Sequence, residues 1–120
     1  WLASLTNALP PMTSDQDIAG LSELFDVQKN HWWNSAPDDR DEPNSIINVF
    51  GAAIGQYIAA RAGLRWAVIT DEDGSELGLT DAHGTVAVFP LNGVAKRWTG
   101  ESSGTIAEYA FGVVGSLAVR

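Results

Sequence analysis

Few side chains in this sequence could carry out acid–base chemistry. Two histidines occur among the 120 residues, His31 beside a pair of tryptophans and His83 in a turn-forming segment. A general base must lie within hydrogen-bond reach of a group that orients it. Either Asp71 or Asp81 could orient His83. These residues are the best acid–base group that the sequence offers, with His83 and Asp71 as the suspects, but no residue is predicted to be catalytic. Proximity in the sequence shows neither a shared pocket nor an oriented pair.

The acidic segment 71–76 is a second place to look for chemistry. A metal site with oxygen ligands needs several carboxylates that converge on one point. The order Asp71-x-Asp73-Gly74 is similar to the start of a calcium-binding loop, but the later acidic ligands of such a loop are absent. An exposed turn between two strands explains the segment better. We therefore expect no metal site and no cofactor. The carboxylates concerned are Asp71, Glu72, Asp73 and Glu76.

Cysteine chemistry and a phosphate-binding loop are excluded by the sequence. The chain has no cysteine, which excludes disulfides, thiolate metal ligands and a cysteine nucleophile. It has no glycine-rich phosphate loop followed by Lys-Ser or Lys-Thr. The sequence thus favours a protein that is not an enzyme, without deciding the question.

Tryptophan and basic residues form a stronger candidate, for binding rather than catalysis. Large rings lose their water readily and guanidinium groups make paired hydrogen bonds, so both are common at binding hot spots. The other interpretation is structural: the tryptophans would close the edge of the core, and Arg65 or Arg97 would pair with the acidic connector or stack on a tryptophan. The candidate binding residues are Trp32, Trp33, Arg65, Trp66, Lys96, Arg97 and Trp98.

The N-terminal part of the chain should be helical. A short helix is expected over 1–9, where apolar residues recur every four positions before two prolines end it. A capping sequence over 13–17 predicts a longer helix that ends near Trp33. The polar segment 34–43 is expected to be an exposed acidic connector.

The strongest helical pattern covers 45–62. Asn44 or Ser45 should cap its start, and Gly63 should end it. Glycines at 51 and 55 are unusual inside a helix, because each costs roughly 0.5–1 kcal/mol relative to alanine. Closely approaching backbone would explain them. That backbone could belong to the protein's own sheet or to a second copy in a homodimer.

A β-region follows this helix. Strands are expected over 64–70, 76–80 and 85–91, and the short turns between them require antiparallel neighbours. A single helical turn over 94–98 and a last helix beginning at Ser103 or Thr105 complete the chain. The expected fold class is α+β, with a three-stranded antiparallel β-meander packed against several helices. We expect one domain over 1–120. Its residues 1–43 form an N-terminal helical part and the acidic connector, and residues 44–120 form a helix, the meander and the C-terminal helix.

Composition limits the possible partners. The net charge is −8 and only seven residues are Lys or Arg, which argues against nucleic-acid binding. No apolar run reaches the roughly 20 residues that a membrane-spanning helix needs. The absence of cysteine is compatible with a reducing compartment. We therefore expect a cytoplasmic protein that contacts neither nucleic acid nor membrane.

The segment 44–98 carries motifs that are distinctive as an ordered set. The motifs are Asn48-Val49-Phe50-Gly51 with Gly55, Gly63-Leu64-Arg65-Trp66, Thr70-Asp71-Glu72-x-Gly74, Val88-Phe89-Pro90 and Val94-x-Lys96-Arg97. In this order they resemble the bacterial domain-of-unknown-function family 3806. The resemblance implies a small α+β domain of uncharacterised activity and supplies no catalytic or binding residue.

Three functional hypotheses remain open. The first is a non-enzymatic protein-interaction module, acting alone or as a homodimer. The second is a small enzyme or small-ligand-binding domain with a pocket between the meander and the N-terminal helices, where His83, Asp71 and Arg65 would be the polar residues. The third is a toxin-neutralising (immunity-type) protein, which only small size and acidity support.

Overall fold

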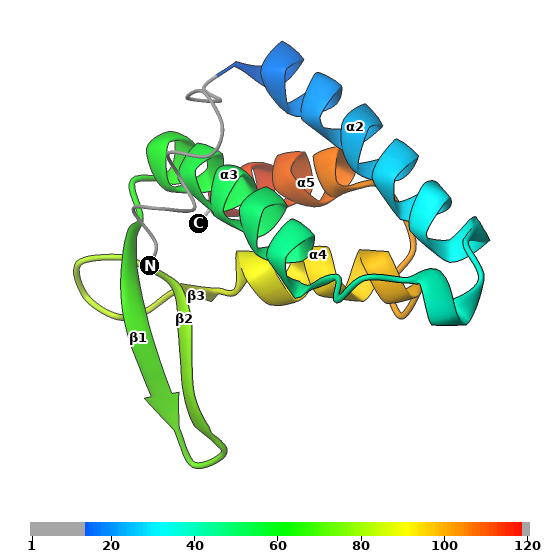
Figure 1. The fold of residues 1–120 in the computed structure, drawn as a ribbon. Helices are drawn as coiled ribbons and strands as arrows, with labels where there is room; N and C mark the ends of the chain where they lie inside the picture. The colour runs from blue at the N-terminus through cyan, green and yellow to red at the C-terminus, as the bar shows by residue number, and fades with distance from the viewer. Residues whose placement is uncertain (1–13, 119–120) are drawn as a thin grey trace.

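The computed structural model describes residues 14–118 and has an α+β fold (Figure 1). The helix expected over 1–9 lies outside the described residues. None of the described helices combines the length and apolar character needed to cross a membrane. The helices are α2 (Asp15–Asn34), the short 3₁₀ helix η1 (Pro37–Asp39), α3 (Asn44–Ala62), α4 (Pro90–Thr99) and α5 (Ile106–Ala118). The strands are β1 (Arg65–Asp71), β2 (Gly74–Thr80) and β3 (Ala87–Val88).

Helix α2 begins where the capping sequence predicted. The Asp17 amide donates to the Ser14 hydroxyl at 3.0 Å, and the Ser14 amide donates to the Asp17 carboxylate at 3.3 Å. This reciprocal pair satisfies two of the amides that a helix start leaves free. The apolar face of α2 is buried through Ile18, Leu21 and Phe25. The predicted helix is therefore confirmed, with its end one residue later than expected.

Helix α3 is confirmed, but its predicted N-cap is wrong. Pro43 occupies the cap position, with no side-chain hydrogen bond to the helix. The Asn44 amide instead donates to the Glu42 carboxylate at 3.2 Å. At the other end, Gly63 has the left-handed φ of 69°, and its amide donates to the Ala59 carbonyl, so the predicted C-cap is correct.

The sheet is an antiparallel meander in the order β1-β2-β3, as predicted. β1 and β2 pair along their whole length, from Arg65 opposite Thr80 to Asp71 opposite Gly74. β3 pairs with β2 through only two residues. The tip of the β1–β2 hairpin extends away from the helices (Figure 1).

The predicted third strand, over 85–91, is largely wrong. Only Ala87–Val88 forms a strand, and α4 then starts at Pro90 and continues through Asn92 and Gly93 to Thr99. The expected single turn over 94–98 is thus the second half of a ten-residue helix. Proline favours the first position of a helix, because its fixed φ is helical and no amide is needed there.

The core lies where the four α-helices and the base of the sheet meet. Phe25 of α2 makes edge-to-face contacts with Phe50 of α3 at 5.2 Å and with Trp98 of α4 at 5.7 Å between ring centroids. Leu79 of β2 is fully buried against this group. The same core therefore joins the helices to the sheet.

The space beside the two glycines inside α3 is filled by this chain itself. A Cβ on Gly51 would lie 2.9 Å from the Leu91 Cα, and a Cβ on Gly55 would lie 2.4 Å from the Trp66 ring. Both positions allow close approach of α4 and β1 to α3. Packing on the protein's own sheet explains Gly55, whereas Gly51 packs against α4 and not against the sheet. The alternative, a dimer face on α3, is not supported.

Candidate binding groove

Three of the predicted binding residues form one aromatic cluster. The Trp32 ring lies 4.8 Å from Trp33 and 5.6 Å from Trp98 between centroids, edge to face in both cases. The Trp33 indole donates to the Trp98 carbonyl at 2.9 Å. Trp98 is only 2% exposed, whereas Trp33 is 43% exposed. The cluster thus packs mainly inward and ties α2 to α4.

Arg40 holds the end of this cluster. Its Nε donates to the Trp32 carbonyl at 3.1 Å and its Nη2 to the Trp33 carbonyl at 2.7 Å. The guanidinium also lies 4.8 Å and 5.1 Å from the centroids of the same two rings. These carbonyls belong to the last turn of α2, where a helix leaves acceptors unsatisfied. An arginine does stack on tryptophan as the structural interpretation proposed, but it is Arg40 of the connector, not Arg65 or Arg97.

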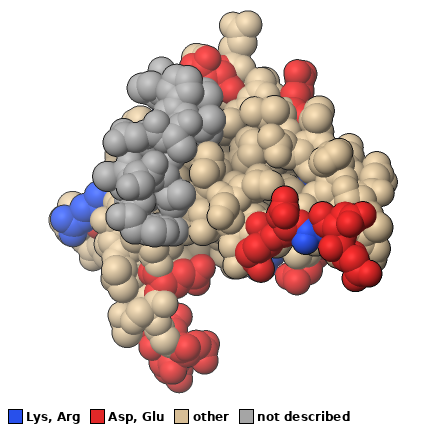
Figure 2. Space-filling view, viewed as in Figure 1, with Lys and Arg blue, Asp and Glu red and all other residues tan. Residues whose placement is uncertain are grey.

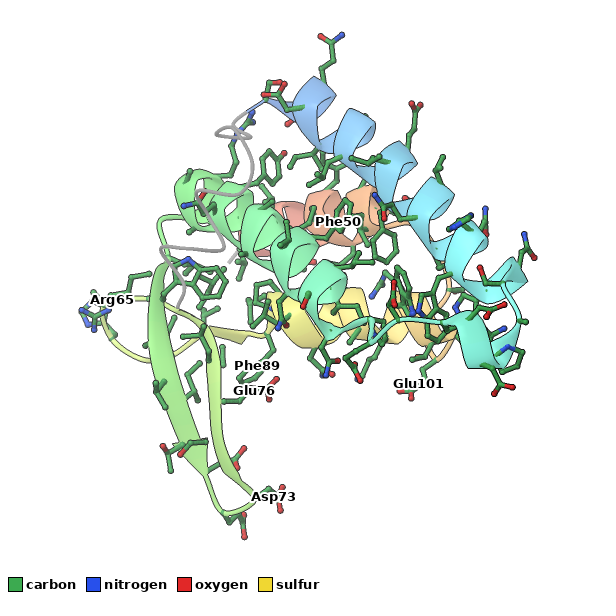
Figure 3. All side chains as sticks on the ribbon, viewed as in Figure 1. Phe50, Arg65, Asp73, Glu76, Phe89 and Glu101 are labelled. Atoms are coloured by element: carbon green, nitrogen blue, oxygen red, sulfur yellow. The ribbon has the colours of Figure 1, made fainter. Side chains whose placement is uncertain are left out.

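The other predicted binding pair lies elsewhere. Trp66 packs its ring against Gly55 and near Pro90, whereas Arg65 is exposed. Figure 3 shows Arg65 at the base of the hairpin, on the opposite side of the molecule from Glu101, which follows α4. The structure therefore does not unite the predicted binding residues into one surface.

The structure does not bring the catalytic candidates together. Asp71 pairs with Gly74 at the start of β2, and His83 follows the end of that strand. β2 is seven residues long, so its two ends lie about 20 Å apart. Asp81, the other possible partner of His83, accepts a hydrogen bond from the Thr85 amide at 2.8 Å.

The pocket imagined between the meander and the N-terminal helices is not supported either. A cavity of 250 Å³ contains Asp71, but it lies on the hairpin beside Phe89 and includes neither His83 nor Arg65. No helix of the N-terminal half lines it. The cavity that contains Asp71 therefore does not bring the acid–base candidates together.

The acidic turn is a hairpin connection. The Asp73 amide donates to the Asp71 carboxylate at 2.8 Å, which closes the turn locally. Within 14–118, no three acidic or histidine side chains are placed to hold one metal ion. Figure 2 shows carboxylates on the hairpin and, separately, at the side of the molecule where the connector runs.

A groove lies between β3 and α5. It consists of two adjoining cavities of 500 Å³ and 390 Å³. Val86 and Leu117 line only the larger cavity, and Asn92 and Lys96 only the smaller one. The residues common to both are Ala87, Val88, Arg97, Tyr109 and Val113. We call this continuous depression the β3–α5 groove.

Arg97 and Tyr109 lie where the two cavities join. The Arg97 guanidinium is 4.6 Å from the centroid of the Tyr109 ring, and its Nη1 donates to the Gly93 carbonyl at 3.1 Å. Burial raises the pKa of the Tyr109 phenol, an effect that the Arg97 charge partly opposes. The Arg97 Nε is enclosed and has no acceptor among the described residues. The groove thus holds a cation fixed on one side by an aromatic ring.

Sequence reasoning identified Arg97 and Lys96 but missed Tyr109 and Gly93. A Cβ on Gly93 would lie 2.5 Å from the Tyr109 Cζ, so the glycine makes room for the ring. An Asn-Gly pair usually marks a turn, but Asn92 and Gly93 lie within α4. The available signal was a glycine four residues before an arginine, the spacing that places both on one helix face.

Comparison with known protein families gives one match. The family described as "Domain of unknown function (DUF3806)" matches residues 26–109. The match starts within α2, well before the resemblance over 44–98, and it includes Arg40 and the groove residues up to Tyr109. No curated protein and no solved structure matches the chain. Because the matched residues form more than half of its length, the chain belongs to the DUF3806 family.

Proposed function

We propose that this protein is a non-enzymatic interaction module that binds an extended, carboxylate-bearing segment of another protein in the β3–α5 groove. The observation that carries the proposal is the position of Arg97. It lines both cavities of the groove together with Ala87 and Val88 of the edge strand β3. The other charged residues in the lining are Lys96 in the smaller cavity and Glu108 in the larger one.

The edge of β3 supports the binding of extended chain. Within the described residues β3 pairs only with β2, so its other edge is unpaired. The larger cavity is lined by β3 and α5 but by no residue of β2, which supports a binding position beside that unpaired edge. An extended peptide can add to such an edge through backbone hydrogen bonds while its side chains enter adjacent pockets.

The charge of the smaller cavity supports a carboxylate as the anchoring group. Its lining contains Lys96 and Arg97 and no acidic residue, although the chain as a whole carries a net charge of −8. Arginine binds carboxylates through charge-assisted hydrogen bonds. The Tyr109 ring restricts the guanidinium, which lowers the entropy lost on binding.

Selection of random peptides displayed on phage against the immobilised protein tests the proposal. Selected peptides are then synthesised with a free or an amidated C-terminus, and with Asp and Glu replaced by Asn and Gln. Loss of affinity on amidation identifies a terminal carboxylate, and loss on the side-chain replacements identifies an acidic side chain. Retention of affinity in both series would contradict carboxylate anchoring.

Variants of the protein locate the site. Ser116 is exposed on the groove wall, so Ser116→Trp should block the groove without removing a core side chain. Ala19→Trp on the exposed side of α2 is the matched control. Lys96→Gln should weaken binding by about tenfold, or 1.4 kcal/mol. Gln56→Glu changes the net charge equally but lies on an exposed part of α3 and should not affect binding. Equal effects of groove and control variants would refute the site.

A further inference from the structure

The second edge of the sheet is longer than the first. β1 extends over seven residues and, within the described part of the chain, pairs only with β2. Val68, at the middle of the strand, is 68% exposed, and both end residues, Arg65 and Asp71, are exposed. The part of the hairpin toward its tip projects from the helical body, and among the described residues no helix covers the outer edge of β1 there (Figure 1).

This edge is unusual because little on it prevents pairing. Proteins generally protect an exposed edge strand with proline, a bulge, a central lysine or a short length. β1 pairs with β2 in continuous register and has none of these devices in its central residues, which are apolar from Trp66 to Ile69. A long, regular and apolar edge is a template for another strand.

The sequence of β1 is complementary to itself. If two copies pair antiparallel about a two-fold axis at Val68, a residue a given number of positions before Val68 lies opposite the partner's residue the same number of positions after it. Arg65 then faces the partner's Asp71, and Asp71 faces the partner's Arg65. Ala67 faces the partner's Ile69, and Val68 faces the partner's Val68. Opposite charges directly across an antiparallel pair stabilise it, whereas like charges destabilise it.

We infer that a second copy of this chain pairs with the outer edge of β1, giving a homodimer with one continuous six-stranded sheet. The contact consists of backbone hydrogen bonds at the centre and an Arg65–Asp71 pair at each end. It lies on the opposite edge of the sheet from the β3–α5 groove, so it neither requires nor blocks the function proposed above. Because the end pairs are exposed, the dimer should weaken as salt concentration rises.

Charge reversal tests both the surface and the register. Arg65→Asp places two Asp–Asp pairs in a homodimer, and Asp71→Arg places two Arg–Arg pairs in one. Each variant alone should have a dimer dissociation constant at least about tenfold higher than the wild type. An equimolar mixture of the two single variants should form a heterodimer, because both of its end pairs then join Asp with Arg. The double variant, in which each end pair is again Asp with Arg, should form a homodimer as the wild type does.

Sedimentation equilibrium and light scattering on the full chain provide the measurement. Asp73→Arg is the matched control, since it lies in the same turn and changes the charge equally, but has no partner in the proposed register. Asp71→Arg also removes the hydrogen bond to the Asp73 amide. The double variant lacks this bond as well, so its recovery assigns the effect to charge pairing. A monomeric wild type, or a double variant that does not recover dimerisation, would overturn the inference.

Discussion

The ring of Trp66 lies against the backbone of Gly55. A Cβ at position 55 would come within 2.4 Å of two atoms of the indole ring and within 3.2 Å of the Pro90 side chain. This contact joins the base of β1 to the middle of α3, next to the start of α4. The glycine thus sets the distance between the sheet and the central helix.

Gly55→Ala should destabilise the protein. Neither the indole nor the proline ring is a flexible chain end, so β1 would have to move away from α3. Overpacking of this kind costs about 1–3 kcal/mol. Urea denaturation followed by tryptophan fluorescence measures the change in the free energy of unfolding.

Gly20→Ala is the matched control for this variant. Gly20 lies within α2, is exposed, and has no neighbouring atom within 4 Å of the point that a Cβ would occupy. Here alanine should stabilise the protein by roughly 0.5–1 kcal/mol, because it raises helix propensity without a clash. If both substitutions changed stability in the same direction, the contact between Trp66 and Gly55 would not be the cause.

Much of the fold could be predicted because its signals are local. The Ser14 cap, the apolar face of α2 and the glycine after α3 each occur within a few residues of the element they define. The prediction for the segment around Pro90 was wrong because Val86 to Leu91 is apolar and rich in β-formers, a pattern typical of a strand. The proline decided the outcome by starting a helix, and of the residues 86–91 only Pro90 itself is fully buried.

The candidate site was less predictable for a different reason. Arg97 stood out by its type, but its stacking partner Tyr109 comes from the next helix, twelve positions later, with no local pattern that relates the two. Arg40 lies in a connector that was expected only to be exposed. Its hydrogen bonds to α2 depend on how the chain turns back after η1. Contacts between elements therefore determine that Arg40 caps a helix whereas Arg97 lines a groove, and such contacts leave no local pattern in the sequence.

Arg40→Lys should destabilise the protein even though it keeps the charge. A lysine cannot reproduce the planar fork that donates from Nε and Nη2 to two adjacent carbonyls and stacks on both rings. Loss of hydrogen bonds from a charged group costs about 1.5–3 kcal/mol. Arg65→Lys, at an exposed position, should stay within about 0.5 kcal/mol of the wild type in urea denaturation. An equal loss in both variants would rule out the capping role of Arg40.

Stability should fall in alkaline solution because of two tyrosines. Burial raises the pKa of Tyr57, and a hydrogen bond to Asp15 at 2.5 Å raises it further. Burial also raises the pKa of Tyr109. Since each folded-state pKa exceeds the ordinary value of 10.0, their contribution to stability is complete below about pH 10 and is lost as the pH rises through the folded-state pKa.

Urea midpoints measured from about pH 8 to about pH 11 check this dependence. Tyr57→Phe and Tyr109→Phe should each reduce the loss of stability across that interval. Tyr57→Phe should also lower stability at neutral pH, because the hydrogen bond to Asp15 is removed. A loss of stability at high pH that is unchanged in both variants would show that other groups cause it.

Two glycine substitutions should distinguish effects on protein stability from effects on the volume of the β3–α5 groove. In Gly93→Ala the new methyl group would meet the Tyr109 ring at 2.5 Å, so the ring must move away from α4 and from Arg97. We expect a loss of about 1–3 kcal/mol in stability. Weaker binding of peptides selected for the groove should accompany it.

Gly112→Ala makes the same chemical change on the opposite wall. No neighbouring atom lies within 4 Å of a Cβ at this position, which lines the larger cavity in the middle of α5. This variant should be more stable by roughly 0.5–1 kcal/mol. Its methyl group takes up part of the cavity, so peptide affinity should fall although stability rises. If peptides bind between β3 and α5, Gly93→Ala should lower stability and Gly112→Ala should raise it, while both variants lower peptide affinity. Unchanged affinity in both variants would place peptide binding elsewhere.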